Sequence, residues 1–326
     1  MLCGTDGASQ IEWEAEKPVP ITGNNDVYRL IDQTRFHWRR AHITPDYFAQ
    51  DRRWQLDRCH LAFNIVSEPD ANAKTLQVVE QVVSQLGHPI VNRPAAVRQT
   101  VREAVAQRLQ GIPGAVVPRV IRVRHPTAGH LKFFIQSGQI AFPAIVRPTG
   151  THTGKVVGLF DRPEDCEAAI TDMDRDYVVI EFIDTRRVDG LYPKIRFFFI
   201  GESVLVRHLF LGVRWNVHGS DYGEVVLGDP RLEAEEEQLL RGGFEALPPA
   251  TQGALRAIRQ RIGLDYFGLD AAILPDGRLV VFEANATMNF FPLSFAGRGL
   301  YKHEVCLPPA QEAMTRLLLG KLGRTA

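Results

Sequence analysis

The sequence predicts a mixed α/β (α+β) fold, in which a short parallel βαβ unit precedes two α+β subdomains that are each built on an antiparallel sheet. Three stretches predict it. Residues 59–92 contain two short apolar runs separated by a helical pattern, and strand, helix, strand at this spacing implies parallel strands. Residues 194–210 and 267–286 each contain two apolar strands joined by a short turn, which is typical of an antiparallel hairpin.

Composition narrows the class of protein. The chain has 326 residues with 38 Lys and Arg against 38 Asp and Glu, so its formal net charge is zero and gives no electrostatic reason to expect nucleic-acid binding. No apolar run approaches the roughly 18 residues of a membrane helix, and the first residues lack the basic start and apolar stretch of a signal peptide. We therefore expect a cytoplasmic protein, whose four widely spaced cysteines stay reduced: Cys3, Cys59, Cys166 and Cys306.

The N-terminal third is expected to form the βαβ unit. We predict a flexible lead-in over residues 1–25 and an abbreviated preceding domain over residues 26–118. Within it, apolar side chains recur at three- and four-residue steps after Asp70 and Asn72, and either residue could cap the helix that this pattern predicts. A second helix is expected over residues 94–109, because a proline opens it and prolines are tolerated in a first helical turn.

Two antiparallel subdomains are expected to follow. The small one, residues 119–190, contains apolar strands around one short helix. The large one, residues 191–326, contains both hairpins, helical patterns over residues 231–262 and an amphipathic terminal helix from Pro308. The second hairpin turns at residues 275–277, where Asp-Gly favours a tight turn because glycine accepts a positive φ.

The most specific group of polar residues lies on that second hairpin. Asp270 is on its first strand, and Glu283 and Asn285 are two positions apart on its second strand, so they point to one face. Two carboxylates about 4 Å apart repel by roughly 4 kcal/mol at an effective dielectric near 20. They must share a proton, pair with cations or bind a metal. Hard oxygen ligands favour Mg²⁺, so one interpretation is a magnesium site. The alternative interpretation is that both carboxylates pair with arginines.

A second feature is the loop over residues 147–155, in which two glycines bracket small hydroxyl residues and a cation stands at each end. Such a loop can lay backbone N–H groups over a polyphosphate. It lacks the GxxxxGK[ST] pattern, so a plain hairpin loop is the alternative. The candidate residues are Arg147, His152, Thr153, Gly154 and Lys155.

Two further features involve strands. The apolar strand with Glu181, Phe182 and Ile183 could offer backbone groups to an adenine, or it could be a core strand.

Four cations follow this strand. Burying a cation in an apolar strand is costly unless it meets an anion, which could belong to a ligand or to the same sheet. These cations are Lys194, Arg196, Arg207 and Arg214.

Taken together and in this order, these features resemble the ATP-grasp superfamily from about residue 59 to about residue 292. The stretch GLDYFGLDAAILPDGRLVVFEANA is similar to the metal-binding end of its glutamate-adding and glutathione-forming ligases. TGTHTGKVV resembles their phosphate loop and VVIEFI their adenine hinge. KIRFFFIGESVLVRHLF, followed by RWN, resembles their arginine-bearing hairpin.

The resemblance implies cofactors and roles. ATP and one or two Mg²⁺ ions, with Mn²⁺ as a possible substitute, would bind, the metal at Asp270, Glu283 and Asn285. The hinge would read adenine, and the nucleotide would also meet Lys194 and Arg196. Arg147 and Arg102 stand where the family usually has lysines on the nucleotide phosphates. Catalysis at the acyl phosphate would fall to three residues: Arg207, Arg214 and Asn216.

The implied activity is that of a carboxylate–amine ligase, which forms an amide through an acyl phosphate from small carboxylate and amine substrates such as amino acids or peptides. The two Lys-to-Arg differences motivate an alternative, a nucleotide-binding regulatory module without turnover. A phosphotransferase needs the same ATP residues and is also open, whereas a plain scaffold has no need of the acidic group. A homodimer that pairs through the preceding domain is left open as well.

Overall fold

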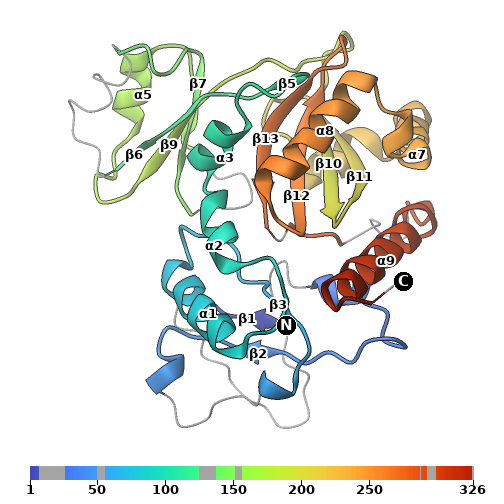
Figure 1. The fold of residues 1–326 in the computed structure, drawn as a ribbon. Helices are drawn as coiled ribbons and strands as arrows, with labels where there is room; N and C mark the ends of the chain where they lie inside the picture. Colours follow the sequence, from blue (N-terminus) through green and yellow to red (C-terminus); the bar gives the residue numbers. More distant parts are fainter. Residues whose placement is uncertain are drawn as a thin grey trace.

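The computed structural model describes residues 1–6, 26–49, 56–124, 137–150, 156–286, 288–291 and 299–324. Figure 1 shows three parts: a small sheet at the upper left, a larger sheet at the upper right, and an N-terminal domain below them. The predicted fold class, a parallel βαβ unit with two antiparallel-sheet subdomains, is confirmed. Among the described residues, no helix has the length and apolar character needed to cross a membrane.

The N-terminal domain contains two pairs of short parallel strands. β3 (Ala62–Phe63), α1 (Ala73–Leu86) and β4 (Ile90–Val91) form the predicted βαβ unit. The structure differs from the expected flexible lead-in at its start, because β1 (Leu2–Cys3) pairs in parallel with β2 (Ala41–His42), and Leu2 also bridges to Asn64 beyond β3. Leu2 is buried, so residues 2 and 3 belong to the domain core.

The start of α1 is held by the same N-terminal segment. The carboxylate of Asp6 accepts hydrogen bonds from the backbone N–H groups of Lys74 (2.9 Å) and Thr75 (2.6 Å). These are two of the donors that a helix leaves unsatisfied in its first turn. Asn72 is the N-cap residue, but its own side chain does not cap the helix; its Oδ1 instead accepts from the N–H of Asp6. A residue 66 positions away thus supplies the cap.

The helix predicted over residues 94–109 is broken into three pieces. They are α2 (Pro94–Val97), a 3₁₀ turn (Arg98–Thr100) and α3 (Arg102–Leu109). The break is at Val101, whose backbone is extended (φ −63°, ψ 146°). This kink sends α3 upward from the N-terminal domain to lie between the two sheets (Figure 1), where it begins with Arg102.

The small sheet has the strand order β6-β9-β7-β8, with all neighbours antiparallel. Its core is a separate apolar cluster that includes the buried thiol of Cys166. The elements are β6 (Val120–Val123), β7 (Ala144–Pro148), β8 (Gly158–Phe160), α5 (Pro163–Ala169) and β9 (Tyr177–Glu181).

The large sheet has the order β11-β10-β12-β13-β5, and both predicted hairpins form in it. β5 (Ala115–Val116) joins β13 in parallel at one edge. The other strands are β10 (Tyr192–Ile200), β11 (Ser203–Gly212), β12 (Tyr266–Ile273) and β13 (Leu279–Asn285). A short helix α6 (Gly219–Asp221) runs into a π-helical turn (Tyr222–Val226) after β11.

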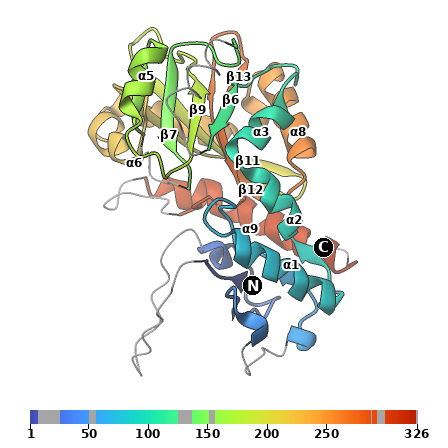
Figure 2. The same ribbon diagram turned by 90° about the vertical axis from the view of Figure 1, so that its left-hand side faces the viewer.

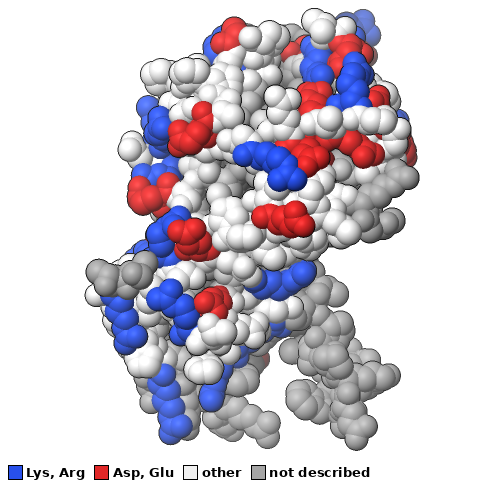
Figure 3. Space-filling view, turned by 90° about the vertical axis from the view of Figure 1, so that its right-hand side faces the viewer, with Lys and Arg blue, Asp and Glu red and all other residues white. Residues whose placement is uncertain are grey.

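Helices cover this sheet. α8 (Pro249–Ile262) lies across its face in Figure 1 and packs on α3, while α7 (Pro230–Gly242) packs on β11. The terminal helix α9 (Tyr301–Lys321) begins seven residues before the predicted start, with Pro308 and Pro309 inside it. Figure 2 shows α9 running below the sheet toward the N-terminal domain. Over the upper part of Figure 3, acidic and basic side chains are interspersed, as expected for zero net charge.

A buried ionic cluster anchors α9. The carboxylate of Glu236 on α7 is fully buried and accepts from Lys302 Nζ (2.8 Å), Tyr222 OH (2.7 Å) and Tyr301 OH (3.0 Å), and from the N–H of Leu209 (3.1 Å). A buried carboxylate satisfied four times in this way avoids the penalty of an unpaired charge.

Asn92 joins the N-terminal domain to the large sheet. It is buried just after β4 with a positive φ of 58°, a conformation that asparagine tolerates better than most residues. Its Oδ1 accepts from the N–H groups of Asp265 and Tyr266 (both 3.0 Å), and its Nδ2 donates to the carbonyl of Tyr266 (2.7 Å). The start of β12 is therefore tied to the end of β4.

Candidate functional site

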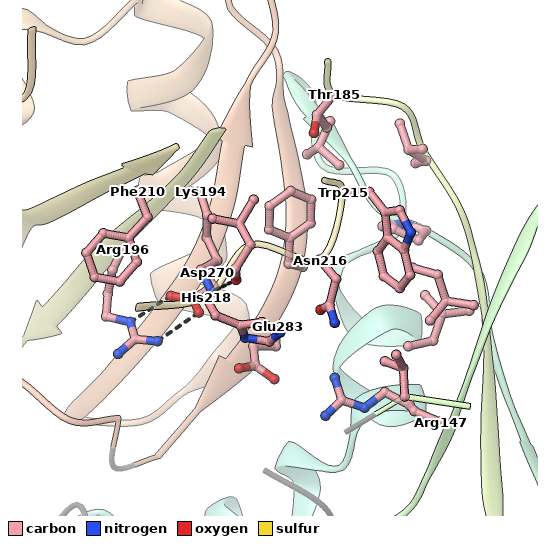
Figure 4. A pocket seen from close by; sticks show the side chains of 18 of the residues that line it. Arg147, Thr185, Lys194, Arg196, Phe210, Trp215, Asn216, His218, Asp270 and Glu283 are labelled. Atoms are coloured by element: carbon pink, nitrogen blue, oxygen red, sulfur yellow. Dashed lines mark hydrogen bonds and ion pairs between the residues drawn. The ribbon is translucent and has the colours of Figure 1, made fainter. Parts of the chain in front are cut away.

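A cleft of about 740 Å³ lies between the two sheets. Figure 4 looks into it: Asp270, Glu283 and Lys194 come from the large sheet, and the guanidinium of Arg147 points toward them from the small sheet opposite. One end of the cleft is apolar and the other end is charged. The apolar end includes Ile145, Ile180, Val280 and Phe282; the charged end includes Arg102, Arg147, Lys194, Arg196, Asp270 and Glu283.

The strand register explains how the charged end is assembled. Arg196 on β10 is directly opposite Asp270 on β12, which is directly opposite Glu283 on β13. Opposed residues of antiparallel strands present their side chains on the same face, so one row carries a cation and two carboxylates.

Two β-bulges flank this row. In β13 the pairing passes from Glu283 to Val281, so Phe282 is the extra residue, and in β11 it passes from His208 to Val206, so Arg207 is the extra residue. A bulge changes which face the following side chains occupy. In β13, Val280 before the bulge and the extra residue Phe282 line the cleft, and so do Glu283 and Asn285 after the bulge.

Asp270 is held by Arg196. The side chain of Asp270 is only 5% exposed, and its two oxygens accept from Arg196 Nε (2.7 Å) and Nη2 (2.8 Å). Burial works against the charge of Arg196, but Asp270 outweighs it and raises the pKa of the guanidinium. Arg196 was expected on the nucleotide; it lines the cleft, but its direct partners are Asp270 and the carbonyl of Asn289 (3.3 Å).

Glu283 is paired with Arg102 at the start of α3. Burial alone would raise the pKa of this carboxyl, but nearby cations outweigh it and lower the pKa to about 2. Arg102 contributes most to the lowering, followed by Arg147 and Arg196. Glu283 is therefore ionised at neutral pH.

Asn285 completes the predicted trio and contacts a residue that the sequence did not single out. Its Nδ2 donates to Oε1 of Glu68, which lies in the loop after β3 with a positive φ of 60°. The amide oxygen of Asn285 consequently points away from Glu68. Glu68 could have been found from its place in the predicted topology, because it follows a parallel strand and ligand-contacting residues concentrate at the carboxyl ends of such strands.

The ligand atoms of Asp270, Glu283 and Asn285 show whether these residues suit a metal ion. Two carboxylates that are cross-strand neighbours, one of them with its pKa held near 2, and one carboxamide provide hard, ionised oxygen ligands. Within the described part of the chain, no group of three or more His, Cys, Asp or Glu side chains is arranged to hold a metal ion. Mg²⁺ usually takes one or two carboxylates plus substrate phosphates, so the residues fit an ion shared with a ligand.

Of the predicted phosphate loop, only Arg147 is described beside the cleft; the others lie outside the described residues: His152, Thr153, Gly154 and Lys155. Burial, and then the charge of Arg102, lower the pKa of Arg147 to about 10. It is still a cation at neutral pH. Lys194 lines the cleft from β10, and its ammonium donates to the carbonyl of Val217.

The predicted hinge residues Glu181, Phe182 and Ile183 line the apolar part of the cleft. The Glu181 carboxylate accepts from the N–H of Arg119 (3.1 Å), which fixes this side chain to the neighbouring chain segment. Phe182 packs edge-on against Trp215, with ring centroids 6.1 Å apart.

The three predicted catalytic residues are separated. Asn216 lines the cleft, but Arg207 and Arg214 are not among the lining residues. Arg207, displaced by the bulge, is buried; its Nε donates to the carbonyl of Phe290 (2.6 Å), and its guanidinium lies over the Phe290 ring. His218, which the sequence placed near the cleft and favoured as an ordinary surface or core histidine over an acid–base group, does line the cleft. Burial, and then Lys194, lower its pKa below the usual value, so it is mostly neutral at pH 7.

Two sheets that enclose a cleft of this kind, with a preceding parallel domain, define the ATP-grasp fold, and comparison with solved structures confirms it. No family model and no curated protein sequence matches the chain. The chain is similar to a D-alanine–D-alanine ligase from Bacillus anthracis complexed with ATP, with a TM-score of 0.53, 12% identity, and 92% of this chain and 91% of that chain covered.

Two other solved structures are similar over most of their length. One is the VanG D-Ala:D-Ser ligase from Enterococcus faecalis (TM-score 0.55, 13% identity, 89% of this chain and 92% of that chain). The other is the macrocyclase MdnC bound with precursor peptide MdnA from Microcystis aeruginosa MRC (TM-score 0.52, 13% identity, 98% and 99%). At these identities the likeness shows the fold.

Proposed function

We propose that this protein is an ATP-dependent carboxylate–amine ligase that forms an amide bond through an acyl phosphate. One observation carries the proposal: the cleft of an ATP-grasp fold joins an apolar end to a charged end, where Asp270 and Glu283 lie with the cations Arg102, Arg147 and Lys194. Figure 4 shows Arg147 opposite the two carboxylates. An apolar slot next to a group of cations and carboxylates matches the shape and charge of a purine nucleotide with its phosphates.

In this proposal the nucleotide base lies at the apolar end, between Ile145, Ile180 and Phe282, beside the backbone of residues 181–183. The phosphates lie toward Arg147 and Arg102, which are cations and present forked donors suited to phosphate oxygens. Lys194 extends this positive region from the large sheet.

Asp270, Glu283 and Asn285 would hold Mg²⁺, which when bound neutralises charge on the phosphates. The protein residues position these groups. Arg196 fixes the orientation of Asp270, and the contact with Glu68 holds the amide group of Asn285. Arg196 and Arg207 also hold the segment after β13, through the carbonyls of Asn289 and Phe290.

The reaction balances in two steps. A substrate carboxylate oxygen attacks the γ-phosphorus of ATP; an O–P bond forms, the bond to the β-phosphate oxygen breaks, and ADP leaves. An amine then attacks the acyl carbon; a C–N bond forms, the C–O bond to phosphate breaks, and inorganic phosphate leaves as the amine loses a proton. Because a carboxylate is a poor electrophile, positioning and charge neutralisation are the main tasks of the site.

Amino acids or peptides are the proposed substrates. The similar structures are named as D-Ala–D-Ala and D-Ala:D-Ser ligases and as a macrocyclase bound with a precursor peptide. This supports an acceptor that carries an amine close to a carboxylate.

The test is ATP consumption with Mg²⁺ across a panel of amino acids and peptides, with products followed by mass spectrometry. We expect ADP, phosphate and a new amide. Glu283→Ala should lower turnover by at least about 100-fold with the fold retained, whereas Glu245→Ala, far from the cleft, should not. A stable phosphate ester in place of an amide would identify a phosphotransferase, and nucleotide binding with no consumption would identify a regulatory module.

A further inference from the structure

The two acidic side chains of the charged end are both engaged by arginines. Arg196 binds both oxygens of Asp270, and Arg102 binds Glu283. The two pairs differ in position. Arg196 and Asp270 are 18% and 5% exposed and come from neighbouring strands of one sheet, whereas Arg102 and Glu283 are 24% and 29% exposed and come from α3 and β13.

This difference decides which pair can exchange partners. Arg196 lies on a central strand, between two hydrogen-bonded neighbours, and also donates to the carbonyl of Asn289, so the sheet fixes it. Arg102 lies at the first position of α3, directly after the extended residue Val101, and reaches Glu283 from outside the sheet. A different rotamer of Arg102 would release Glu283 without disturbing any strand.

A second cation of the cleft, Arg147, indicates where the guanidinium of Arg102 would move. Arg147 lines the same cleft from β7 of the small sheet. After burial, the positive charge of Arg102 is the main cause that lowers the pKa of Arg147, as expected for two guanidinium groups that repel each other. Two guanidinium groups that repel each other across a cleft are stabilised by an anion between them. A polyphosphate would therefore compete with Glu283 for Arg102.

We propose that Arg102 acts as an internal competitor of the divalent cation: it occupies Glu283 until nucleotide phosphates draw it away, so that the cation enters the site only together with the nucleotide. The inference rests on the proposed function, because it takes the anion to be a nucleotide polyphosphate. Arg196 has a separate task, since it positions Asp270 in both states. By linkage, nucleotide and cation each raise the affinity of the site for the other.

The test measures Mn²⁺ binding in the absence of any nucleotide, by electron paramagnetic resonance of free Mn²⁺ during titration of the full chain. Wild-type protein should show only weak binding. Arg102→Met should bind Mn²⁺ about tenfold more tightly or better, because the Glu283 carboxylate is then open to it. Adding Glu283→Gln to Arg102→Met should remove the gain.

Two controls accompany this test. Arg93→Met removes one positive charge from an exposed position nine residues earlier and should leave Mn²⁺ binding as in wild type. Arg102→Lys retains the charge and should also bind weakly. If thermal unfolding shows that Arg102→Met is not folded, Arg102→Gln takes its place.

The results that would overturn the competition differ from those that would overturn the proposed function. Equal Mn²⁺ affinity in wild type and Arg102→Met, or tight binding to wild type without nucleotide, overturns the competition. Failure of wild type to bind a non-hydrolysable ATP analogue overturns the proposed function instead, and that is measured independently with the analogue and Mg²⁺ by calorimetry.

Discussion

Arg196 and Asp270 form a two-fold hydrogen-bonded ion pair, with distances of 2.7 and 2.8 Å, between directly opposed positions of β10 and β12. The pair is almost completely buried, and it lies between the two bulges that shape the charged end of the cleft. A buried pair of this kind is costly to break on one side only, since the remaining charge is left without compensation.

Arg196→Met should therefore reduce the free energy of unfolding by about 3–5 kcal/mol, measured by urea denaturation. The double variant Arg196→Met/Asp270→Asn should recover part of the loss, because the uncompensated carboxylate is gone. Arg162→Met, in an exposed pair with Asp165, is the matched control and should leave the midpoint unchanged. Equal midpoints for wild type, Arg196→Met and Arg162→Met would contradict the assignment.

The low pKa of Glu283 predicts a specific pH window for stability. A carboxyl whose pKa is about 2 in the folded protein and about 4.5 in the unfolded chain contributes stability that is complete above pH 4.5. As the pH falls toward 2, that contribution is lost. The difference in unfolding free energy between wild type and Glu283→Gln should thus shrink from pH 5 to pH 2.

Removing Arg102 should narrow the pH range over which Glu283 loses its contribution to stability. In an Arg102→Met background, the Glu283→Gln difference should be smaller at pH 5 and should disappear at a higher pH, because Arg102 is the cation that lowers this pKa most. A difference that is constant between pH 2 and pH 5 would show that Glu283 is not electrostatically coupled to the cations of the cleft.

Arg122 connects the small sheet to the rest of the molecule. From β6 it donates to Asp70 of the N-terminal domain (2.9 Å) and to both oxygens of Glu103 on α3 (2.5 and 3.1 Å). Since Glu103 follows Arg102, adjacent residues of α3 contact the small and the large sheet. Arg122→Gln should raise the hydrogen exchange of β6 and β9 by roughly 5–10-fold, measured by mass spectrometry.

The control for Arg122 is Arg175→Gln, an exposed residue of the same subdomain, which should leave exchange unchanged. If exchange in β6 and β9 is the same in both variants, the ion pairs of Arg122 do not restrain the small sheet.

Asn92 is predicted to be the most sensitive uncharged residue at the domain junction. Asn92→Ala leaves the backbone N–H groups of Asp265 and Tyr266 without their acceptor and should cost about 2–4 kcal/mol. Urea denaturation checks this, with the exposed Gln99→Ala as control. A loss below that of the control would mean that water replaces the side chain.

Much of the fold could be predicted from the sequence, because local patterns determine it. The βαβ unit and both hairpins follow from short-range alternation of apolar residues and from turn residues such as Asp276-Gly277. The single helix predicted over residues 94–109 is instead broken at Val101, and the terminal helix begins seven residues before the predicted start at Pro308. In both cases packing against distant elements outweighs local preference.

Strand periodicity is enough to place Asp270, Glu283 and Asn285 together on one face of the second hairpin. Their partners depend on the tertiary structure. Glu68, Arg102 and Arg196 are 74 to 217 positions away from the residues they contact. Arg207 is the extra residue of a one-residue bulge and does not line the cleft. Periodicity acts over a few residues, whereas ion pairing and register depend on how separate strands and helices meet in space.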